Sequence, residues 1–184
     1  MKSVFLIITG LFMLVGQVFA GEPPAAQEDT DAREKTENLV QMAFEAAIQG
    51  IGHTGGLYPF ALLQEGTEKV STVSWDGEPE DRLPADEWSE ELMQVLRKKA
   101  QEEEFNAAAL ARLHSGESEE GKPFLGVWVL ADHENDAPWI AFLPLLETDR
   151  GTYEQADELV YAATDQWIFP PSDEEEDETE QQPD

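Results

Sequence analysis

The chain contains no cysteine among its 184 residues. This absence excludes disulfide bonds, thiolate metal sites, a cysteine nucleophile and a lipid-attachment cysteine. Any folded form must therefore be stabilised by its apolar core and its hydrogen bonds, without covalent cross-links.

Basic residues are scarce as well. The sequence has 11 Lys and Arg against 40 Asp and Glu, and its formal net charge at pH 7 is −29. Such a charge repels nucleic acid and anionic lipid surfaces, so we expect no nucleic-acid partner. Basic proteins, cations and neutral molecules remain as candidate partners.

Long apolar runs are absent beyond the first 20 residues. Lys2 precedes the apolar stretch Val4–Val15, and the small residue Ala20 closes the segment. This pattern is typical of a secretory signal peptide cleaved after Ala20, and the stretch is short for a membrane span. We expect residues 1–20 to be removed, leaving an exported protein, periplasmic or extracellular, with no stable membrane anchor. An uncleaved anchor is the alternative.

Two acidic segments flank a region with regular apolar patterning. Residues 21–32 contain two prolines and no large apolar side chain, and eight of the thirteen residues in 172–184 are acidic. Neither segment can bury enough apolar surface to fold, so we expect a flexible leader and a disordered tail. Residues 33–171 hold all five tryptophans and have the size of one globular domain.

Apolar spacing predicts three helices in this region. The first runs from a capping-box pattern at Asp31 and Glu34 to Gly50, and the second begins at Pro84. The second carries one apolar face, made by Trp88, Leu92, Val95 and Leu96. The third follows a second capping box that begins at Thr152. Its apolar stripe consists of Ala156, Leu159, Val160, Ala163 and Trp167.

Five strands complete the predicted order α-β-β-α-β-β-β-α, an α+β class with a central, mostly antiparallel five-stranded sheet. They are Leu57–Gln64, Lys69–Trp75, Phe105–His114, Phe124–Ala131 and Trp139–Leu146. The alanines of Phe105–His114 favour a helix, but its position before two apolar strands favours a strand, which we predict.

This order of elements, over residues 33–169, is similar to the layout of profilin-like, roadblock and longin domains. Those folds mostly serve as binding and scaffold modules, so the resemblance implies binding rather than catalysis.

The stretch Gly50–Phe60 contains a G-x-G-x-x-G pattern. A dinucleotide site needs a strand before these glycines and a helix after them, so that phosphate meets the helix N-terminus. Here a helix precedes them and a strand follows, which indicates a helix C-cap and a loop. We therefore predict no cofactor. His53 lies among these glycines as an exposed imidazole that can titrate or bind a metal, although a polar loop residue is the simpler interpretation.

The pentapeptide Asp132–Asp136 gathers three carboxylates, an imidazole and an amide between two apolar strands. Alternate acids resemble a calcium loop, but Ala137 stands where glycine is required and Leu143 where the bidentate glutamate belongs. We interpret the segment as a polar hairpin tip. A weak divalent-cation site is the alternative, with candidate ligands at Asp132, His133, Glu134 and Asp136.

No nucleophile elbow, zinc helix or phosphate loop is present in the sequence. The acidic clusters fall on predicted loops, tails and polar helix faces, where no carboxyl group is desolvated enough for acid catalysis. Tryptophans at strand ends are often half exposed, so Tyr58, Trp75 and Trp139, with His53, are candidates for a ligand groove.

These observations favour a non-catalytic binding or scaffold domain with an acidic surface. Two alternatives remain open: a hydrolase whose site is assembled only by the fold, and a weak binder of divalent cations through acidic loops. A buried carboxylate beside His53 in a cleft would favour the hydrolase.

Overall fold

The computed structural model describes residues 18–20, 30–66, 69–102, 104–117, 121–148 and 152–170. The rest of the predicted signal peptide, most of the predicted leader and the acidic tail lie outside these residues. Val18–Ala20 forms a short strand, β1, which pairs with β8 (Val160–Ala163).

Within the described residues the fold is α+β, with two α-helices and one antiparallel sheet. The helices are α1 (Thr30–Thr54) and α2 (Ala85–Gln101), and a 3-10 turn covers Pro79–Asp81. The other strands are β2 (Phe60–Glu65), β3 (Lys69–Val73), β4 (Ala107–Glu117), β5 (Pro123–His133), β6 (Asp136–Glu147) and β7 (Tyr153–Gln155). The strand order is β1-β8-β6-β5-β4-β2-β3, with β7 paired to β6.

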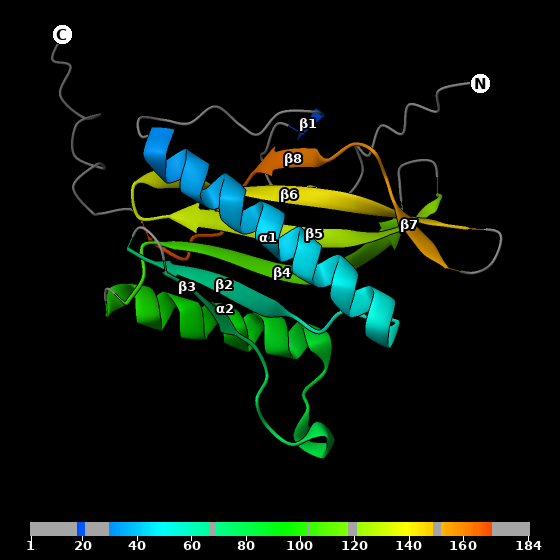
Figure 1. The fold of residues 1–184 in the computed structure, drawn as a ribbon, viewed down its shortest axis with the longest axis horizontal. Coiled ribbons are helices and arrows are strands. Elements are labelled where there is room, and N and C mark those ends of the chain that lie inside the picture. Colours follow the sequence, from blue (N-terminus) through cyan, green and yellow to red (C-terminus); the bar gives the residue numbers. More distant parts are fainter. Residues whose placement is uncertain are drawn as a thin grey trace, which may run out of the picture.

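Each face of the sheet is covered by one helix. Figure 1 shows α1 running diagonally across one face, where it packs mainly on β4 and β5, while α2 contributes to the core of the opposite face. Strand β4 contributes side chains to the cores on both faces of the sheet. Ala107, Ala109 and Ala111 lie under α1, and Ala108 and Leu110 lie on the α2 side.

The alanines of β4 are explained by close packing. Ala43 and Ala47 of α1 are fully buried in the same cluster as Ala107, Ala109 and Ala111. Small side chains on both elements let the helix backbone approach the sheet closely. The predicted strand in this region is confirmed, because packing outweighs the helix propensity of alanine.

The second predicted helix is confirmed, and so are both predicted hairpin strands that precede it. Trp88, Leu92 and Leu96 are buried on α2, but Val95 is 38% exposed and does not belong to the apolar face. The indole Nε1 of Trp88 donates to the Pro59 carbonyl at 2.8 Å, which anchors α2 to the start of β2.

The third predicted helix is wrong. Its residues form β7 and β8, which pair with β6. The hydroxyl of Thr152, expected to cap a helix, instead lies 2.8 Å from the Thr148 hydroxyl in a turn. Pairing Val160–Ala163 with β6 satisfies backbone groups that would otherwise form an open edge, which a helix would not do. The sheet therefore has more strands than the five expected, and the resemblance to profilin-like, roadblock and longin layouts fails in its last element.

The first helix extends beyond its predicted end. It continues through Gly50 and Gly52 to Thr54, and Gly55 then adopts a positive φ of 74°. The Gly55 N–H donates to the Ile51 carbonyl at 2.8 Å, as expected of a helix C-terminal glycine. The glycine pattern thus begins inside the last turns of a helix and is followed by a strand, which is the reverse of a dinucleotide site.

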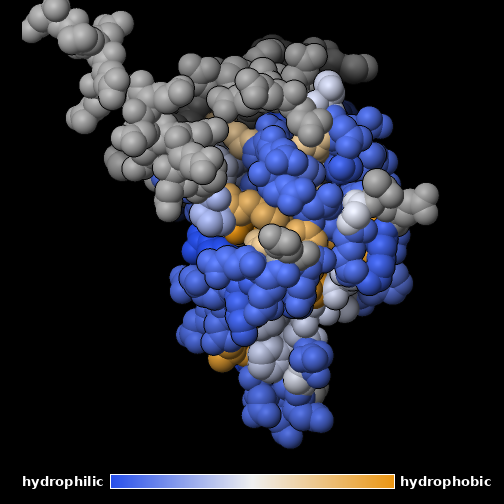
Figure 2. Space-filling view, turned by 90° about the vertical axis from the view of Figure 1, so that its left-hand side faces the viewer, coloured by the Kyte–Doolittle hydropathy of each residue, from blue (hydrophilic) through white to orange (hydrophobic). Residues whose placement is uncertain are grey.

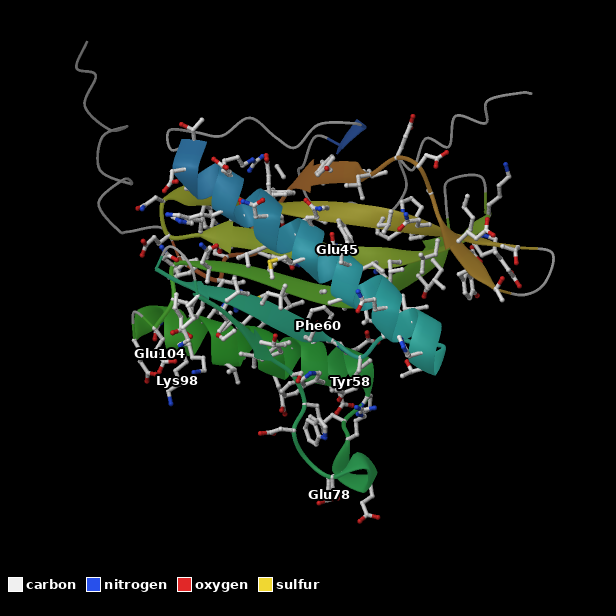
Figure 3. All side chains as sticks on the ribbon, viewed as in Figure 1. Glu45, Tyr58, Phe60, Glu78, Lys98 and Glu104 are labelled. Carbon is white, nitrogen blue, oxygen red and sulfur yellow. The ribbon has the colours of Figure 1, made fainter. Side chains whose placement is uncertain are left out.

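The connection from β3 to α2 projects away from the sheet. Figure 3 places Glu78 at the far end of this connection and Tyr58 where it meets the body of the protein. The Tyr58 hydroxyl donates to the Leu83 carbonyl at 2.9 Å, and the Arg82 guanidinium lies 4.2 Å from the Tyr58 ring centroid.

The view in Figure 2 is largely hydrophilic, with a narrow band of apolar residues at its centre. No helix in the described part of the chain is both long enough and apolar enough to cross a membrane.

Candidate functional site

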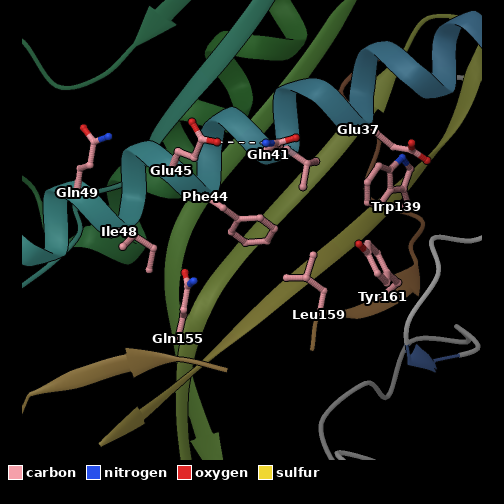
Figure 4. Close-up of a pocket in the computed structure, with 11 residues that line it drawn as sticks. Glu37, Gln41, Phe44, Glu45, Ile48, Gln49, Trp139, Gln155, Leu159 and Tyr161 are labelled. Carbon is pink, nitrogen blue, oxygen red and sulfur yellow. Dashed lines mark hydrogen bonds between the residues drawn. The ribbon is translucent and has the colours of Figure 1, made fainter. Parts of the chain in front are cut away.

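A groove of about 620 Å³ lies between α1, β6 and the segment that carries β7 and β8 (Figure 4). We call it the α1 groove. Its apolar residues are Val40, Phe44, Ile48, Trp139, Leu159 and Tyr161, and its polar residues are Glu37, Gln41, Glu45, Gln49 and Gln155. The helix, the sheet and the C-terminal strands each contribute, so the groove exists only in the folded chain.

The floor of the α1 groove is apolar. In Figure 4, Phe44 of α1 points toward Leu159 across the groove, and Ile48 follows one turn further along the helix. Phe44 is 8% exposed, whereas Ile48 and Leu159 are half-buried. Because part of this apolar surface still faces solvent, an apolar ligand would gain free energy by covering it.

The rim combines carboxylates and amides. Gln41 and Glu45 are one helical turn apart, and the Gln41 amide donates to the Glu45 carboxylate at 3.2 Å. Glu37, Gln49 and Gln155 complete the rim, and none of the lining residues is basic. The rim therefore presents negative charge and neutral hydrogen-bonding groups, which disfavour an anionic ligand.

Two aromatic residues, whose rings contact each other at a tilt, close one end of the groove. The rings of Trp139 and Tyr161 are 5.8 Å apart, and Trp139 is only 1% exposed. The Trp139 Nε1 is buried and has no hydrogen-bond partner among the described residues. Burial raises the pKa of Tyr161, and the nearby Glu37 carboxylate adds to this effect, so the hydroxyl stays protonated at neutral pH.

Arg33 lies behind Trp139 and connects the groove to the β5–β6 hairpin. Its guanidinium is 4.5 Å from the Trp139 ring centroid and makes ion pairs with Asp136 at 3.3 Å and Glu37 at 3.5 Å. Burial lowers the pKa of Arg33, but the charge of Asp136 opposes this effect. The pair holds the first turn of α1 against the hairpin.

The hairpin tip itself is not simply a solvated turn. Strand β5 ends at His133 and β6 begins at Asp136, so the predicted hairpin is confirmed, but Asp132 is 0% and His133 2% exposed. Only Glu134 and Asn135 are exposed in this pentapeptide. The expectation that all acidic clusters are solvated is wrong for Asp132.

The Asp132 carboxylate holds the C-terminal segment of the domain. One oxygen accepts from the backbone N–H groups of Ile168 at 2.5 Å and Phe169 at 2.9 Å, and the other accepts from His133 N–H at 2.9 Å. Burial raises the pKa of Asp132 to about 7, although the three N–H bonds act in the opposite direction. We call this arrangement the Asp132 clasp.

Three of the four candidate metal ligands are engaged in these structural contacts, and the fourth, Glu134, is exposed. Asp132 accepts backbone N–H bonds, Asp136 pairs with Arg33, and the His133 Nδ1 accepts from the Asn135 N–H at 3.0 Å. In the part of the chain that the structure describes, no group of three His, Asp or Glu side chains is arranged to hold a metal ion.

The structure does not bring His53, Tyr58, Trp75 and Trp139 into one groove. Tyr58 and Trp75 both contact Trp88 on the α2 side, whereas Trp139 belongs to the α1 side. His53 is exposed at the end of α1, where its Nδ1 lies 2.6 Å from the Gln49 carbonyl. It is twenty residues from Arg33, or about 30 Å along the helix, so it does not meet the buried carboxylate of the hairpin.

Of the predicted candidates, only Trp139 lines the α1 groove. Phe44 lies within the first predicted helix and Leu159 in the apolar stripe of the third, and the sequence does not single out Tyr161 or Arg33. Apolar residues alternate with Glu and Gln along Glu37–Gln49. This pattern indicates the groove, because it makes the apolar surface of α1 wider than its contact with the sheet requires.

Comparisons with known proteins yield no match for this chain among protein families, curated proteins or solved structures.

Proposed function

We propose that this protein is an exported, non-catalytic binding protein whose α1 groove takes an apolar ligand that is neutral or positively charged. One observation carries the proposal: a groove of about 620 Å³ has a partly exposed apolar floor and a rim of carboxylates and amides with no basic residue. Export is supported by the signal-peptide pattern of residues 1–20.

The chemistry of the hairpin favours binding over hydrolysis. Asp132 has the raised pKa of a general acid, but it is fully enclosed and its oxygens accept backbone N–H groups. A general acid must reach a substrate proton within hydrogen-bonding distance. The Asp132 clasp therefore acts in this proposal as a structural element that holds the C-terminal segment.

The test is a fluorescence titration of the full chain with three apolar probes below their micelle concentrations. N-phenyl-1-naphthylamine is neutral, dodecyltrimethylammonium is cationic, and dodecyl sulfate is anionic. We expect saturable binding of the first two, and binding of dodecyl sulfate weaker by about tenfold or more, because the rim carboxylates repel it.

Variants place the binding in the α1 groove. Ile48→Gln and Leu159→Gln should each weaken the neutral probe by about tenfold, because each removes apolar contact from the floor. Val95→Gln, on the exposed side of α2, is the matched control and should leave binding unchanged. The double variant Glu37→Gln and Glu45→Gln should remove the preference for the cationic probe over dodecyl sulfate. Equal binding of all three probes, or no effect of the two floor variants, would disprove the proposal.

A further inference from the structure

A second cavity, of about 520 Å³, lies on the opposite face of the sheet from the α1 groove. We call it the α2 pocket. It is formed between one side of α2 and the strands β4 and β5, and its floor includes the buried Leu110 and Trp128. Arg112 of β4 lines the same cavity, since alternation along the strand places it on the same face as Leu110.

The Arg112 guanidinium forms no ion pair within the part of the chain that the structure describes. It lies 4.6 Å from the Trp128 ring centroid, and its Nε is buried without a hydrogen-bond partner. No carboxylate of the described residues forms an ion pair with it, although acids outnumber bases 40 to 11 in this chain. Burial lowers the pKa of Arg112, and Asp86 opposes this only at longer range. Arg112 is half-buried, and a partly desolvated charge without a partner costs free energy that a bound carboxylate would offset.

A second guanidinium lines the same cavity. The Nε of Arg97 donates to the Trp167 carbonyl at 2.8 Å, which fixes the side chain against the C-terminal segment. Its remaining N–H groups have no ion-pair partner among the described residues. Two arginines of a strongly acidic protein thus line one cavity, and guanidinium groups are suited to bind a carboxylate.

The mouth of the α2 pocket carries the opposite charge. Asp86 and Glu90 are exposed on α2 and line the cavity one helical turn apart. A polyanion such as phosphate would meet these carboxylates and the net charge of −29 before it reached the arginines. A ligand with a negatively charged end at the floor and a positively charged end at the mouth would complement both the arginines and the carboxylates.

We propose that the α2 pocket binds a small zwitterion, with its carboxylate on Arg112 and Arg97, its ammonium group near Asp86 and Glu90, and a short apolar body against Trp128 and Met93. This site is separate from the α1 groove, and either proposal can fail without the other.

The test is isothermal titration calorimetry of the full chain with three probes that share one carbon skeleton: 5-aminopentanoate, pentanoate and pentylamine. We expect 5-aminopentanoate to bind most tightly, pentanoate several-fold more weakly and pentylamine not measurably. Arg112→Gln should weaken 5-aminopentanoate by about tenfold or more, because the charge-assisted bonds are lost. The matched control, Arg82→Gln, removes an arginine that also lies over an aromatic ring but lines no part of this pocket.

A second variant tests the mouth without touching a buried group. Asp86→Asn should weaken 5-aminopentanoate and leave pentanoate unchanged or slightly tighter, since only the zwitterion gains from a carboxylate there. The proposal is overturned if no probe binds at about 10 mM, far weaker than a site with two charge-assisted contacts should be. It is also overturned if pentylamine binds as well as 5-aminopentanoate, or if Arg112→Gln and Arg82→Gln have the same effect.

Discussion

Arg33 and Arg112 make the same aromatic contact on opposite faces of one sheet. The Arg33 guanidinium lies 4.5 Å from the ring centroid of Trp139 on the α1 side, and that of Arg112 lies 4.6 Å from the ring centroid of Trp128 on the α2 side. Burial lowers the pKa of both arginines. They differ in what neutralises their charge.

Arg33 is paired with Asp136 and Glu37, whereas Arg112 has no ion pair among the described residues and lines a cavity. A cation over an aromatic ring is therefore not enough to assign a role. The paired arginine fixes α1 to the hairpin. The unpaired arginine keeps its charge available to a ligand, as binding sites do at some cost in stability.

The largest expected effect on stability comes from replacing the paired arginine, Arg33. Arg33→Met should lower the free energy of unfolding by about 3 to 5 kcal/mol, because Asp136 stays buried without a counter-charge. Urea unfolding followed by tryptophan fluorescence measures the change. Arg82→Met, which removes an exposed arginine over Tyr58, is the control and should cost no more than about 1 kcal/mol. Equal losses of unfolding free energy in Arg33→Met and Arg82→Met would contradict a stabilising role of the Arg33 ion pairs.

The Asp132 clasp gives the next largest effect, visible as a dependence on pH. The Asp132 pKa is 3.8 in the unfolded chain and about 7 in the fold, so the folded state binds more protons between these values. Its stabilising contribution is complete below about pH 4 and is lost as pH rises through about 7.

Relative to Asp132→Asn, the wild type should therefore lose up to about 4 kcal/mol of its free energy of unfolding between about pH 4 and pH 8. Urea midpoints measured across this range for both proteins give the difference. Asp157→Asn, at an exposed carboxylate, should show no such trend. A difference that stays flat with pH would contradict the burial of Asp132 as the cause of its raised pKa.

Replacing the unpaired arginine should have a small effect on stability. Arg112→Met loses the contact with Trp128, worth about 0.5 to 2 kcal/mol, but also removes a half-buried charge that has no ion pair among the described residues. The two terms nearly cancel, and we expect the free energy of unfolding to change by less than about 1 kcal/mol. A loss as large as that of Arg33→Met would show that Arg112 is structural.

A similarly small effect should come from giving Arg112 a partner. Gln166 lines the α2 pocket, and Gln166→Glu places a carboxylate in the same cavity. We expect a gain of about 0.5 to 1 kcal/mol in the free energy of unfolding, with weaker binding of 5-aminopentanoate. Gln94→Glu, at the exposed mouth, should give neither result. Calorimetry and urea unfolding together would show whether Arg112 has become equivalent to Arg33.

The sequence was most informative where local pattern and packing agree. The spacing of Trp88, Leu92 and Leu96 predicted α2, and the continuous apolar runs predicted β5 and β6, because these features depend on residues close in the chain. The end of α1 was misjudged, since packing along the helix carries it through two glycines that favour an earlier stop.

The C-terminal region shows what local pattern cannot supply. Ala156–Trp167 has helical spacing, yet Val160–Ala163 pairs with β6, whose free edge lies outside any sequence window. The polar composition of Asp132–Asp136 likewise predicts a solvated turn, although Asp132, His133 and Asp136 are buried. Arg33 is 103 residues away from Asp136, and Ile168 is 36 residues away from Asp132.

By itself, the sequence determined the acidic surface charge, the absence of disulfides and most of the helices and strands, because these follow from composition and short-range periodicity. Only the tertiary structure decided which charges are paired, which are enclosed and which face a cavity. The free energy of a buried charge depends on the groups that surround it, and folding brings those groups together from distant parts of the chain.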